Sequence, residues 1–207
     1  MNARTLRQIV GLAPELQAGA MLQAAKTALV LIDYQHEYRN GPLALPDEAG
    51  VTPVARRLRA WADRSGVAVI HVLHHAATGS LLFGEGSPGA VPLDGLVPAV
   101  GETIIYKHLP SAFAGTGLAG VLQENGVERL LVAGYMTHNC VDSTAREAFH
   151  HGYRVAVVAD ACATRDLPGP DGNTIRAEQV QAGVLAGLGD RIAEITDVAT
   201  LAAMKVA

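Results

Sequence analysis

The sequence predicts a single α/β domain with three layers, α/β/α, around a doubly wound and mostly parallel sheet of six strands. Of its 207 residues, 49% are hydrophobic and 17% are charged, which is enough apolar material for one well-packed core. Short apolar runs alternate with longer segments of helical periodicity, as expected for strands that helices cover on both faces. Alternation of this kind is typical of a Rossmann-like fold.

The predicted elements follow one another in a regular order. The strands are residues 28–32, 67–72, 103–106, 129–133, 154–159 and 191–195, and the main helices are residues 51–64, 117–125, 141–150 and 173–188. A glycine stands between a helix and the next strand at four places, where a left-handed C-cap residue is favoured: Gly66, Gly126, Gly152 and Gly189. Residues 74–101 are rich in glycine and proline, which predicts a long loop of the kind that often forms a lid.

We expect two parts in the chain, an N-terminal helical extension (1–26) and the α/β domain (27–207). The extension lacks the continuous apolar stretch of a signal peptide, and no apolar run reaches the ~20 residues that a bilayer requires. The net charge is −4 and the 16 lysines and arginines are scattered, so we expect neither a nucleic-acid partner nor a membrane partner. The two cysteines are too few for a disulfide framework, and we expect a cytoplasmic protein with free thiols.

Three residues that carry chemistry follow predicted strands. Asp33, Lys107 and Cys140 come after the first, third and fourth strands, and Cys140 begins a helix. The carboxyl ends of parallel strands share one edge of the sheet, where ligands bind, so we expect these side chains to meet. A helix N-terminus and a nearby lysine would favour the thiolate of Cys140. Asp33 could take the thiol proton and return it to a leaving amine.

Each of these residues also has an ordinary structural interpretation. Cys140 could be a small core residue, Asp33 a cap for the next segment, and Lys107 a solvated strand end. A redox pair of Cys140 with Cys162 is a further alternative. The joint placement of the three residues at strand ends favours catalysis.

Three motifs carry a resemblance to a known family. They are ALVLIDYQ (28–35), YK (106–107) followed by SAF (111–113), and GYMTHNCVDST (134–144). In order and spacing, the chain from about residue 27 onwards resembles the isochorismatase-like cysteine hydrolases. The resemblance implies an Asp33–Lys107–Cys140 triad. It also implies a cis peptide between Met136 and Thr137 and an oxyanion hole built from the backbone N–H groups of Thr137 and Cys140.

The same resemblance implies the class of reaction. The family contains amidases that act on small amides, carbamoyl amines and ureido acids, and also enzymes that cleave the vinyl ether of isochorismate, which typically lack the cysteine. Cys140 therefore favours cleavage of a C–N bond through a thioester, with release of ammonia or an amine. A vinyl ether hydrolase and a non-catalytic binding module of the same fold are the alternatives.

We further expect a small-molecule substrate and assembly into a homo-oligomer, either a dimer or a tetramer, as is common in the family. The substrate contacts expected from their places near the motifs are the polar Gln35 and His138 and the apolar walls Tyr34, Phe83 and Phe113. No clear charge clamp indicates what else the substrate carries.

Two patterns suggest cofactors but lack the context that such sites need. The segment 46–50 has no histidine where nicotinamidases place a metal ligand, and the cluster of His71, His74 and His75 lacks further ligands at suitable positions. Two G-x-G-x-x-G matches, 84–89 and 115–120, do not lie in a dinucleotide-binding strand–turn–helix unit with an acidic residue after the next strand. We therefore expect neither a metal nor another cofactor.

Overall fold

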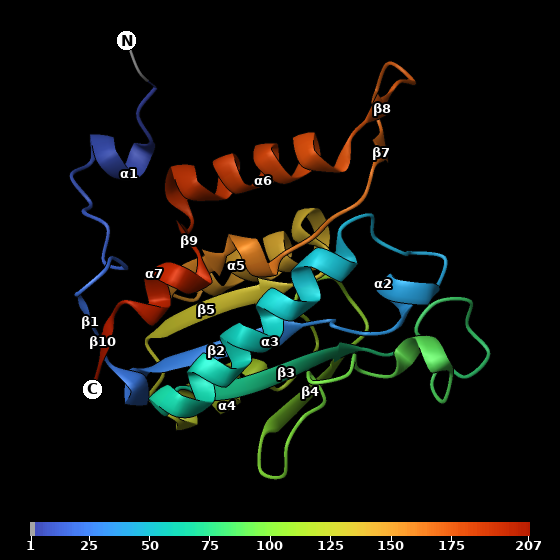
Figure 1. Cartoon of the computed structure of the whole chain (residues 1–207), viewed down its shortest axis with the longest axis horizontal. Helices are drawn as coiled ribbons and strands as arrows, with labels where there is room; N and C mark the ends of the chain where they lie inside the picture. Colours follow the sequence, from blue (N-terminus) through green and yellow to red (C-terminus); the bar gives the residue numbers. More distant parts are fainter. Residues whose placement is uncertain (1–2) are drawn as a thin grey trace.

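A six-stranded sheet forms the centre of the computed structural model, which describes residues 3–207 (Figure 1). The strand order is β4-β3-β2-β5-β6-β9, and every neighbouring pair is parallel. The strands are β2 (Thr27–Ile32), β3 (Ala68–His74), β4 (Thr103–Lys107), β5 (Arg129–Gly134), β6 (Arg154–Val158) and β9 (Glu194–Thr196). The predicted three-layer, doubly wound fold is confirmed, and the sheet is parallel throughout.

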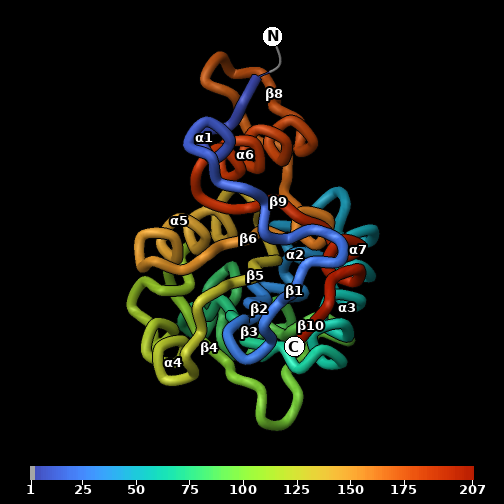
Figure 2. Tube along the Cα trace, turned by 90° about the vertical axis from the view of Figure 1, so that its left-hand side faces the viewer, coloured from blue at the N-terminus to red at the C-terminus, as the bar shows by residue number. Residues whose placement is uncertain are grey.

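Helices cover both faces of this sheet. In Figure 2, α3 and α7 lie on one side of the sheet, and α4 and α5 lie on the other. The helices are α3 (Glu48–Ser65), α4 (Leu118–Glu124), α5 (Asp142–His150), α6 (Ala177–Arg191) and α7 (Val198–Ala202). In α3 the buried residues Val51, Ala55, Leu58 and Ala62 recur at helical spacing, which gives the helix one apolar face to pack on the sheet.

The direction of winding reverses between β2 and β5. From β2 the chain proceeds to β3 and β4 on one side, and then crosses over to build β5, β6 and β9 on the other. Such a switch point opens a crevice at the carboxyl ends of the two central strands. Gly134 ends β5 with φ +150°, and a Cβ there would collide with the carbonyl oxygen of Ile32. Only glycine allows the two central strands to approach this closely.

The structure differs from the prediction at the C-terminal helix. Helix α6 begins at Ala177, because the residues before it form a small hairpin, β7 (Leu167–Pro168) with β8 (Thr174–Ile175). The helix then continues to Arg191, so the last strand of the main sheet begins only at Glu194.

The segment between β3 and β4 is largely irregular, as predicted, with one 3-10 turn, η2 (Pro88–Ala90). Leu81 at its tip is 82% exposed, whereas Phe83 is buried with φ +52°. A short helix that the sequence did not predict, α2 (Glu37–Asn40), follows β2.

Only a small part of residues 3–26, the described part of the N-terminal extension, is helical. It contains one α-helical turn, α1 (Leu6–Ile9), a 3-10 turn, η1 (Ala24–Lys26), and a two-residue strand, β1 (Met21–Leu22), which pairs with β10 (Lys205–Val206). Gly11 and Gly19, both at positive φ, and Pro14 interrupt any longer helix. Within residues 3–207 no helix is long and apolar enough to cross a membrane.

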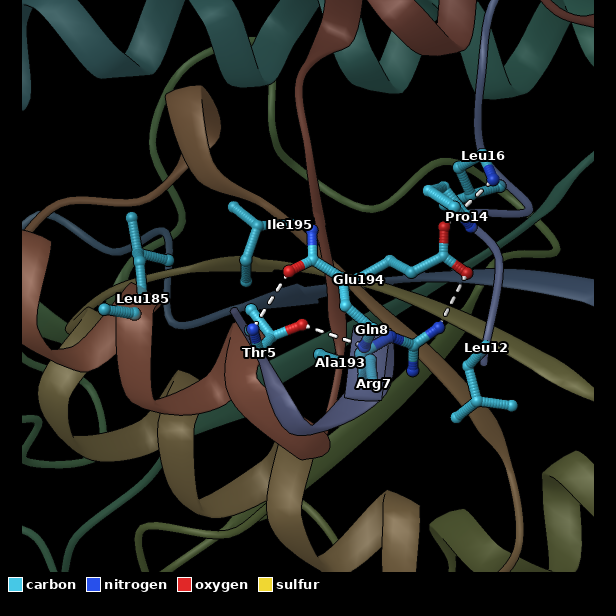
Figure 3. Close-up of a pocket in the computed structure, with 12 residues that line it drawn as sticks. Thr5, Arg7, Gln8, Leu12, Pro14, Leu16, Leu185, Ala193, Glu194 and Ile195 are labelled. Carbon is cyan, nitrogen blue, oxygen red and sulfur yellow. Dashed lines mark hydrogen bonds and ion pairs between the residues drawn. The ribbon is translucent and has the colours of Figure 1, made fainter. Parts of the chain in front are cut away.

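Glu194 of β9 anchors this extension to the domain. Its carboxylate accepts hydrogen bonds from the backbone N–H groups of Glu15 and Leu16, at 2.9 and 3.0 Å, and pairs with Arg7 at 3.3 Å. Figure 3 shows Arg7 and Glu194 beside a cavity of about 520 Å³. Apolar side chains that include Leu12 and Leu185 line much of this cavity between the extension, α6 and β9.

Candidate active site

Asp33 and Lys107 form a buried ion pair at the carboxyl edge of the sheet. Asp33 follows β2 with φ +53°, and its backbone N–H donates to the carbonyl of Val72, at 2.8 Å. Lys107 is the last residue of β4, and its Nζ lies 2.8 Å from Asp33 Oδ2, with both side chains fully buried. Burial raises the pKa of Asp33 and is opposed by Lys107. Burial also works against the charge of Lys107, but Asp33 and Cys140 outweigh it and raise the pKa of this ammonium.

Cys140 is hydrogen-bonded to the same ammonium group of Lys107. It belongs to a π-helical turn, Thr137–Val141, that leads directly into α5, and its side chain is buried. Lys107 Nζ is 3.3 Å from Cys140 Sγ. The structure thus places Asp33, Lys107 and Cys140 together, with Lys107 bonded to each of the other two.

The protonation state of Cys140 differs from the expectation. Burial and the neighbouring Asp33 carboxylate raise the pKa of the thiol to about 12, despite the opposing effect of Lys107. The sequence had suggested that the helix N-terminus and the lysine would favour a thiolate. The raised pKa instead indicates that Cys140 is a thiol in the resting protein. A base has to remove the proton before sulfur can attack.

The backbone beside the thiol also differs from the expected oxyanion hole. The Thr137 N–H donates to the carbonyl of Ala163, at 2.9 Å, because the chain pairing of β5 continues beyond the strand through a bridge between Tyr135 and Ala163. The prediction of Thr137 as an oxyanion donor is therefore wrong. The cis peptide joins Tyr135 to Met136, one residue before the predicted pair Met136 and Thr137. Among residues 3–207, the Met136 N–H finds no hydrogen-bond acceptor, whereas the N–H of Cys140 remains a predicted donor.

Two of the five predicted substrate contacts have structural roles instead. Gln35 is fully buried and donates both amide hydrogens to backbone carbonyls, of His74 and Ala90. The hydroxyl of Tyr34 donates to the carbonyl of Ala161, and its ring packs edge-on against Tyr135. These groups stabilise the ends of the strands, and none of their donor hydrogens is left for a substrate.

Phe113 is the third of the predicted contacts. Its ring packs against His151 and Tyr153, at centroid distances of 5.0 and 6.2 Å. Both neighbours follow the C-terminal end of α5, whereas Cys140 precedes the N-terminal end. The ring of Phe113 therefore packs beside the C-terminal end of α5, whereas a contact between Phe113 and a substrate stays a prediction.

The other two predicted contacts lie closer to the triad. Phe83 packs on Tyr38 and on His74, at centroid distances of 5.4 and 4.8 Å. His138 belongs to the same π-helical turn as Cys140, and its Nδ1 is hydrogen-bonded to the hydroxyl of Thr164. Whether Phe83 and His138 contact a substrate remains a prediction.

The three clustered histidines have separate partners. His71 Nε2 is 3.0 Å from Glu102 Oε2, His74 Nδ1 is 3.1 Å from Lys107 Nζ, and the ring of His75 packs on Tyr106. Strand alternation separates His71 from His74. Their side chains therefore do not converge on one point.

Sequence reasoning missed Arg165 and Tyr38. Burial raises the pKa of Tyr38 well above its usual range; Asp33 and Cys140 add to this rise, and Arg165 opposes it. The charges of the triad and of the Arg165 guanidinium thus act on the same hydroxyl. Arg165 comes shortly after β6, so the rule that pointed to Asp33 and Lys107 could also have found it.

The sequence and the fold of the chain match those of a known protein family. The model of the isochorismatase domain matches residues 27–197. The chain therefore belongs to the isochorismatase family. A crystal structure of an isochorismatase from Pseudomonas putida KT2440 superimposes with a TM-score of 0.88 and 35% identity, over 96% of this chain and 99% of that one.

Curated members of the isochorismatase family agree with this assignment. The uncharacterized isochorismatase family protein YddQ of Bacillus subtilis is 39% identical over 165 residues, which are 78% of this chain and 91% of that protein. Maleamate amidohydrolase of Pseudomonas putida is 31% identical over 156 residues, which are 68% of this chain and 73% of that enzyme. The predicted family is confirmed, and the protein is a hydrolase.

Proposed function

We propose that this isochorismatase-family protein is a cysteine amidohydrolase that cleaves a C–N bond of a small molecule. The observation that carries the proposal is the shared ammonium of Lys107, which bonds to Asp33 at 2.8 Å and to Cys140 at 3.3 Å in a fully buried position. A base and a nucleophile held by one cation form the minimal apparatus of covalent acyl transfer. The similarity to maleamate amidohydrolase supports the same reaction class.

The chemistry follows from the resting protonation states. Because the pKa of Cys140 is raised to about 12, Asp33 removes the thiol proton as sulfur attacks the amide carbonyl carbon, and Lys107 stabilises the developing thiolate. We assign the oxyanion to backbone N–H groups of the turn around Cys140: the Cys140 N–H is the predicted donor, and the Met136 N–H, which has no acceptor within residues 3–207, is a second candidate. Asp33 then gives its proton to the leaving nitrogen, and the C–N bond breaks to leave a thioester. Attack by a water molecule that Asp33 deprotonates releases the acid and restores the thiol.

Arg165 supports a narrower substrate class. Its buried Nε has no acceptor among the described residues, and its Nη1 makes a long hydrogen bond of 3.4 Å to the carbonyl of Asp166. Burial lowers the pKa of the nearby His138, and Arg165 lowers it further. A half-buried guanidinium with free donors binds carboxylates well. We therefore propose that the substrate is a small amide that also carries a carboxylate, as maleamate does.

An ammonia-release screen tests the reaction class. The panel contains small amides with and without a carboxylate, ureido acids and carbamoyl amines, each with and without chelator, together with isochorismate as a vinyl ether. We expect release from a carboxylate-bearing amide, unaffected by chelator. Cys140→Ala abolishes it, whereas Cys162→Ala is the matched control, because both thiols are buried and have their pKa raised to about 12.

Two other outcomes would move the function elsewhere in the family. Pyruvate release from isochorismate that persists in Cys140→Ala identifies a vinyl ether hydrolase. Binding of a panel compound without turnover identifies a binding module. Sedimentation of the same preparation tests the predicted dimer or tetramer, and the cytoplasmic location remains a prediction.

A further inference from the structure

The backbone of His74, the last residue of β3, is held from both sides by one side chain. Gln35 Oε1 accepts a hydrogen bond from the His74 N–H, at 2.9 Å, and Gln35 Nε2 donates to the His74 carbonyl, at 3.0 Å. The second hydrogen of Nε2 goes to the carbonyl of Ala90, at 2.8 Å. An amide side chain with three hydrogen bonds is fixed in direction. The position of the His74 backbone therefore follows that of Gln35, two residues after Asp33.

The imidazole ring of His74 is held in turn by Phe83. The two rings pack with their centroids 4.8 Å apart. Phe83 has φ +52°, a conformation that bulky residues rarely adopt, and its N–H donates to the buried carboxylate of Glu37, at 3.3 Å. Strained backbone persists where its surroundings enforce it. The conformation of the loop after β3 thus holds the Phe83 ring in contact with the His74 ring.

Nδ1 of the His74 ring is hydrogen-bonded to the ammonium group of Lys107. Lys107 Nζ lies 3.1 Å from His74 Nδ1, 2.8 Å from Asp33 Oδ2 and 3.3 Å from Cys140 Sγ. An ammonium group has three hydrogens and accepts none. Its three hydrogens match the three neighbours, so Nδ1 must be the unprotonated acceptor and the ring proton must lie on Nε2.

The imidazole is therefore neutral. Burial and the charge of Lys107 lower the pKa of His74 to about 4, with smaller contributions from His108 and His75. Neutral His74 adds no repulsion to the ammonium and offers it a lone pair. An apolar residue in its place would leave one buried hydrogen of Lys107 without an acceptor, which is unfavourable.

We propose that His74 is a positioning residue that aims the Lys107 ammonium at Cys140. It acts through Lys107, has no hydrogen bond to Cys140 within residues 3–207, and keeps the cation from turning wholly toward Asp33. The inference rests on the proposed triad chemistry, but its test uses a reaction that needs no amide substrate. Alkylation of Cys140 by iodoacetamide depends on the thiolate, which Lys107 stabilises.

The test compares two replacements of His74 in a Cys162→Ala background, so that only one thiol reacts. His74→Asn can keep an acceptor oxygen near the position of Nδ1, whereas His74→Leu has none. We expect His74→Leu to react about tenfold more slowly near pH 8, with its rate–pH curve displaced to higher pH, in line with one weakened charge-assisted hydrogen bond. His74→Asn should stay within about threefold of the parent.

His75→Leu is the matched control, because its ring packs on Tyr106 and makes no side-chain contact with Lys107 in the described part of the chain. Equal rates for His74→Leu and the parent would overturn the proposal, as would an Asn variant as slow as the Leu variant. Imidazole ¹⁵N spectra of the unmutated protein give a second test should His74→Leu fail to fold. A proton on Nδ1 at neutral pH overturns the proposal, and a proton on Nε2 supports it.

Amide turnover separates this inference from the proposed function. If a substrate is found, His74→Leu should lower kcat with little change in KM. If no amide is hydrolysed but the alkylation pattern holds, the amidase proposal fails and the role of His74 stands.

Discussion

Lys107 Nζ and Asp33 Oδ2 lie 2.8 Å apart with both side chains fully buried, so the charge of each affects the pKa of the other and the pKa of the neighbouring Cys140 thiol. Asp33 raises the pKa of Cys140 and Lys107 lowers it. Asp33→Asn should therefore lower the thiol pKa and speed alkylation near pH 7, while amide hydrolysis falls by at least about 100-fold for want of a base. Lys107→Gln should raise the thiol pKa and slow both reactions.

The rate of alkylation as a function of pH distinguishes the two variants. Removal of one partner of a buried pair destabilises a fold by about 3–5 kcal/mol, so circular dichroism must first show that each variant is folded. Parallel shifts of the thiol pKa in both variants would contradict the assigned roles.

Arg165 should discriminate between amides. Arg165→Gln removes a charged donor, and we expect KM for a carboxylate-bearing amide to rise by about 10- to 100-fold, while a neutral amide is turned over as before. Arg146→Gln is the control, since Arg146 is an exposed residue of α5 that pairs with Asp142. Steady-state kinetics on both amides decide the matter, and an equal loss on both would place Arg165 outside the substrate site.

The neutral state of His74 gives stability a particular dependence on pH. The pKa of His74 is lowered from 6.5 to about 4 in the folded protein, so between these values the unfolded chain binds a proton that the folded chain does not. The free energy of unfolding should fall as pH drops from about 6.5 to 4, and this contribution should be absent in His74→Asn. Urea unfolding at pH 7.5 and pH 4.5 measures it. A difference between the two proteins that is the same at both pH values would refute the assignment.

Gly134 should tolerate no side chain. Gly134→Ala introduces a Cβ that collides with Ile32 at φ +150°, and we expect a loss of about 3–5 kcal/mol in the free energy of unfolding. Gly120→Ala is the counterpart, because Gly120 lies within α4 and nothing is within 4 Å of the added atom. Gly120→Ala should raise the free energy of unfolding by up to about 1 kcal/mol. Thermal melts check this prediction: Tm should fall in Gly134→Ala and rise in Gly120→Ala.

Glu194 should determine how firmly the N-terminal extension is held. Glu194→Gln removes the charge that pairs with Arg7 and that accepts hydrogen bonds from two backbone N–H groups (Figure 3). We expect the free energy of unfolding to fall by about 1–3 kcal/mol. Glu128→Gln, which disrupts exposed pairs with Lys26 and Arg154, should change stability by no more than about 1 kcal/mol. Limited proteolysis should cut Glu194→Gln sooner within residues 11–19. Equal rates of cleavage would show that the extension is held elsewhere.

The sequence was informative where one local rule was sufficient. Continuous apolar runs indicated the strands of the parallel sheet, and the rule that ligands bind after strand ends brought Asp33, Lys107 and Cys140 together. The same rule would have found His74 and Arg165, but His74 was considered only as a metal ligand. The strand order, and with it the switch point between β2 and β5, became visible only in the structure.

What the sequence could not show depends on contacts between distant segments. Thr137 looked like a free donor because its partner, the carbonyl of Ala163, comes from another part of the chain. Gln35 looked like a substrate contact because its position near Asp33 was visible, whereas its bonds to His74 and Ala90 were not. Side-chain direction at such positions follows from tertiary pairing rather than from spacing in the motif.

The pairing of β1 with β10 has a consequence for synthesis on the ribosome. The backbone of residues 19–24 is hydrogen-bonded to residues 203–207, by bonds that include Ala24 N–H to Ala207 O at 2.7 Å. These early residues leave the ribosome long before their partners exist, whereas β2, β3 and α3 can begin to pack at once. Residues 19–24 therefore stay without these backbone partners until residues 203–207 have been synthesised, so this pairing cannot guide the folding of the strands that lie between them.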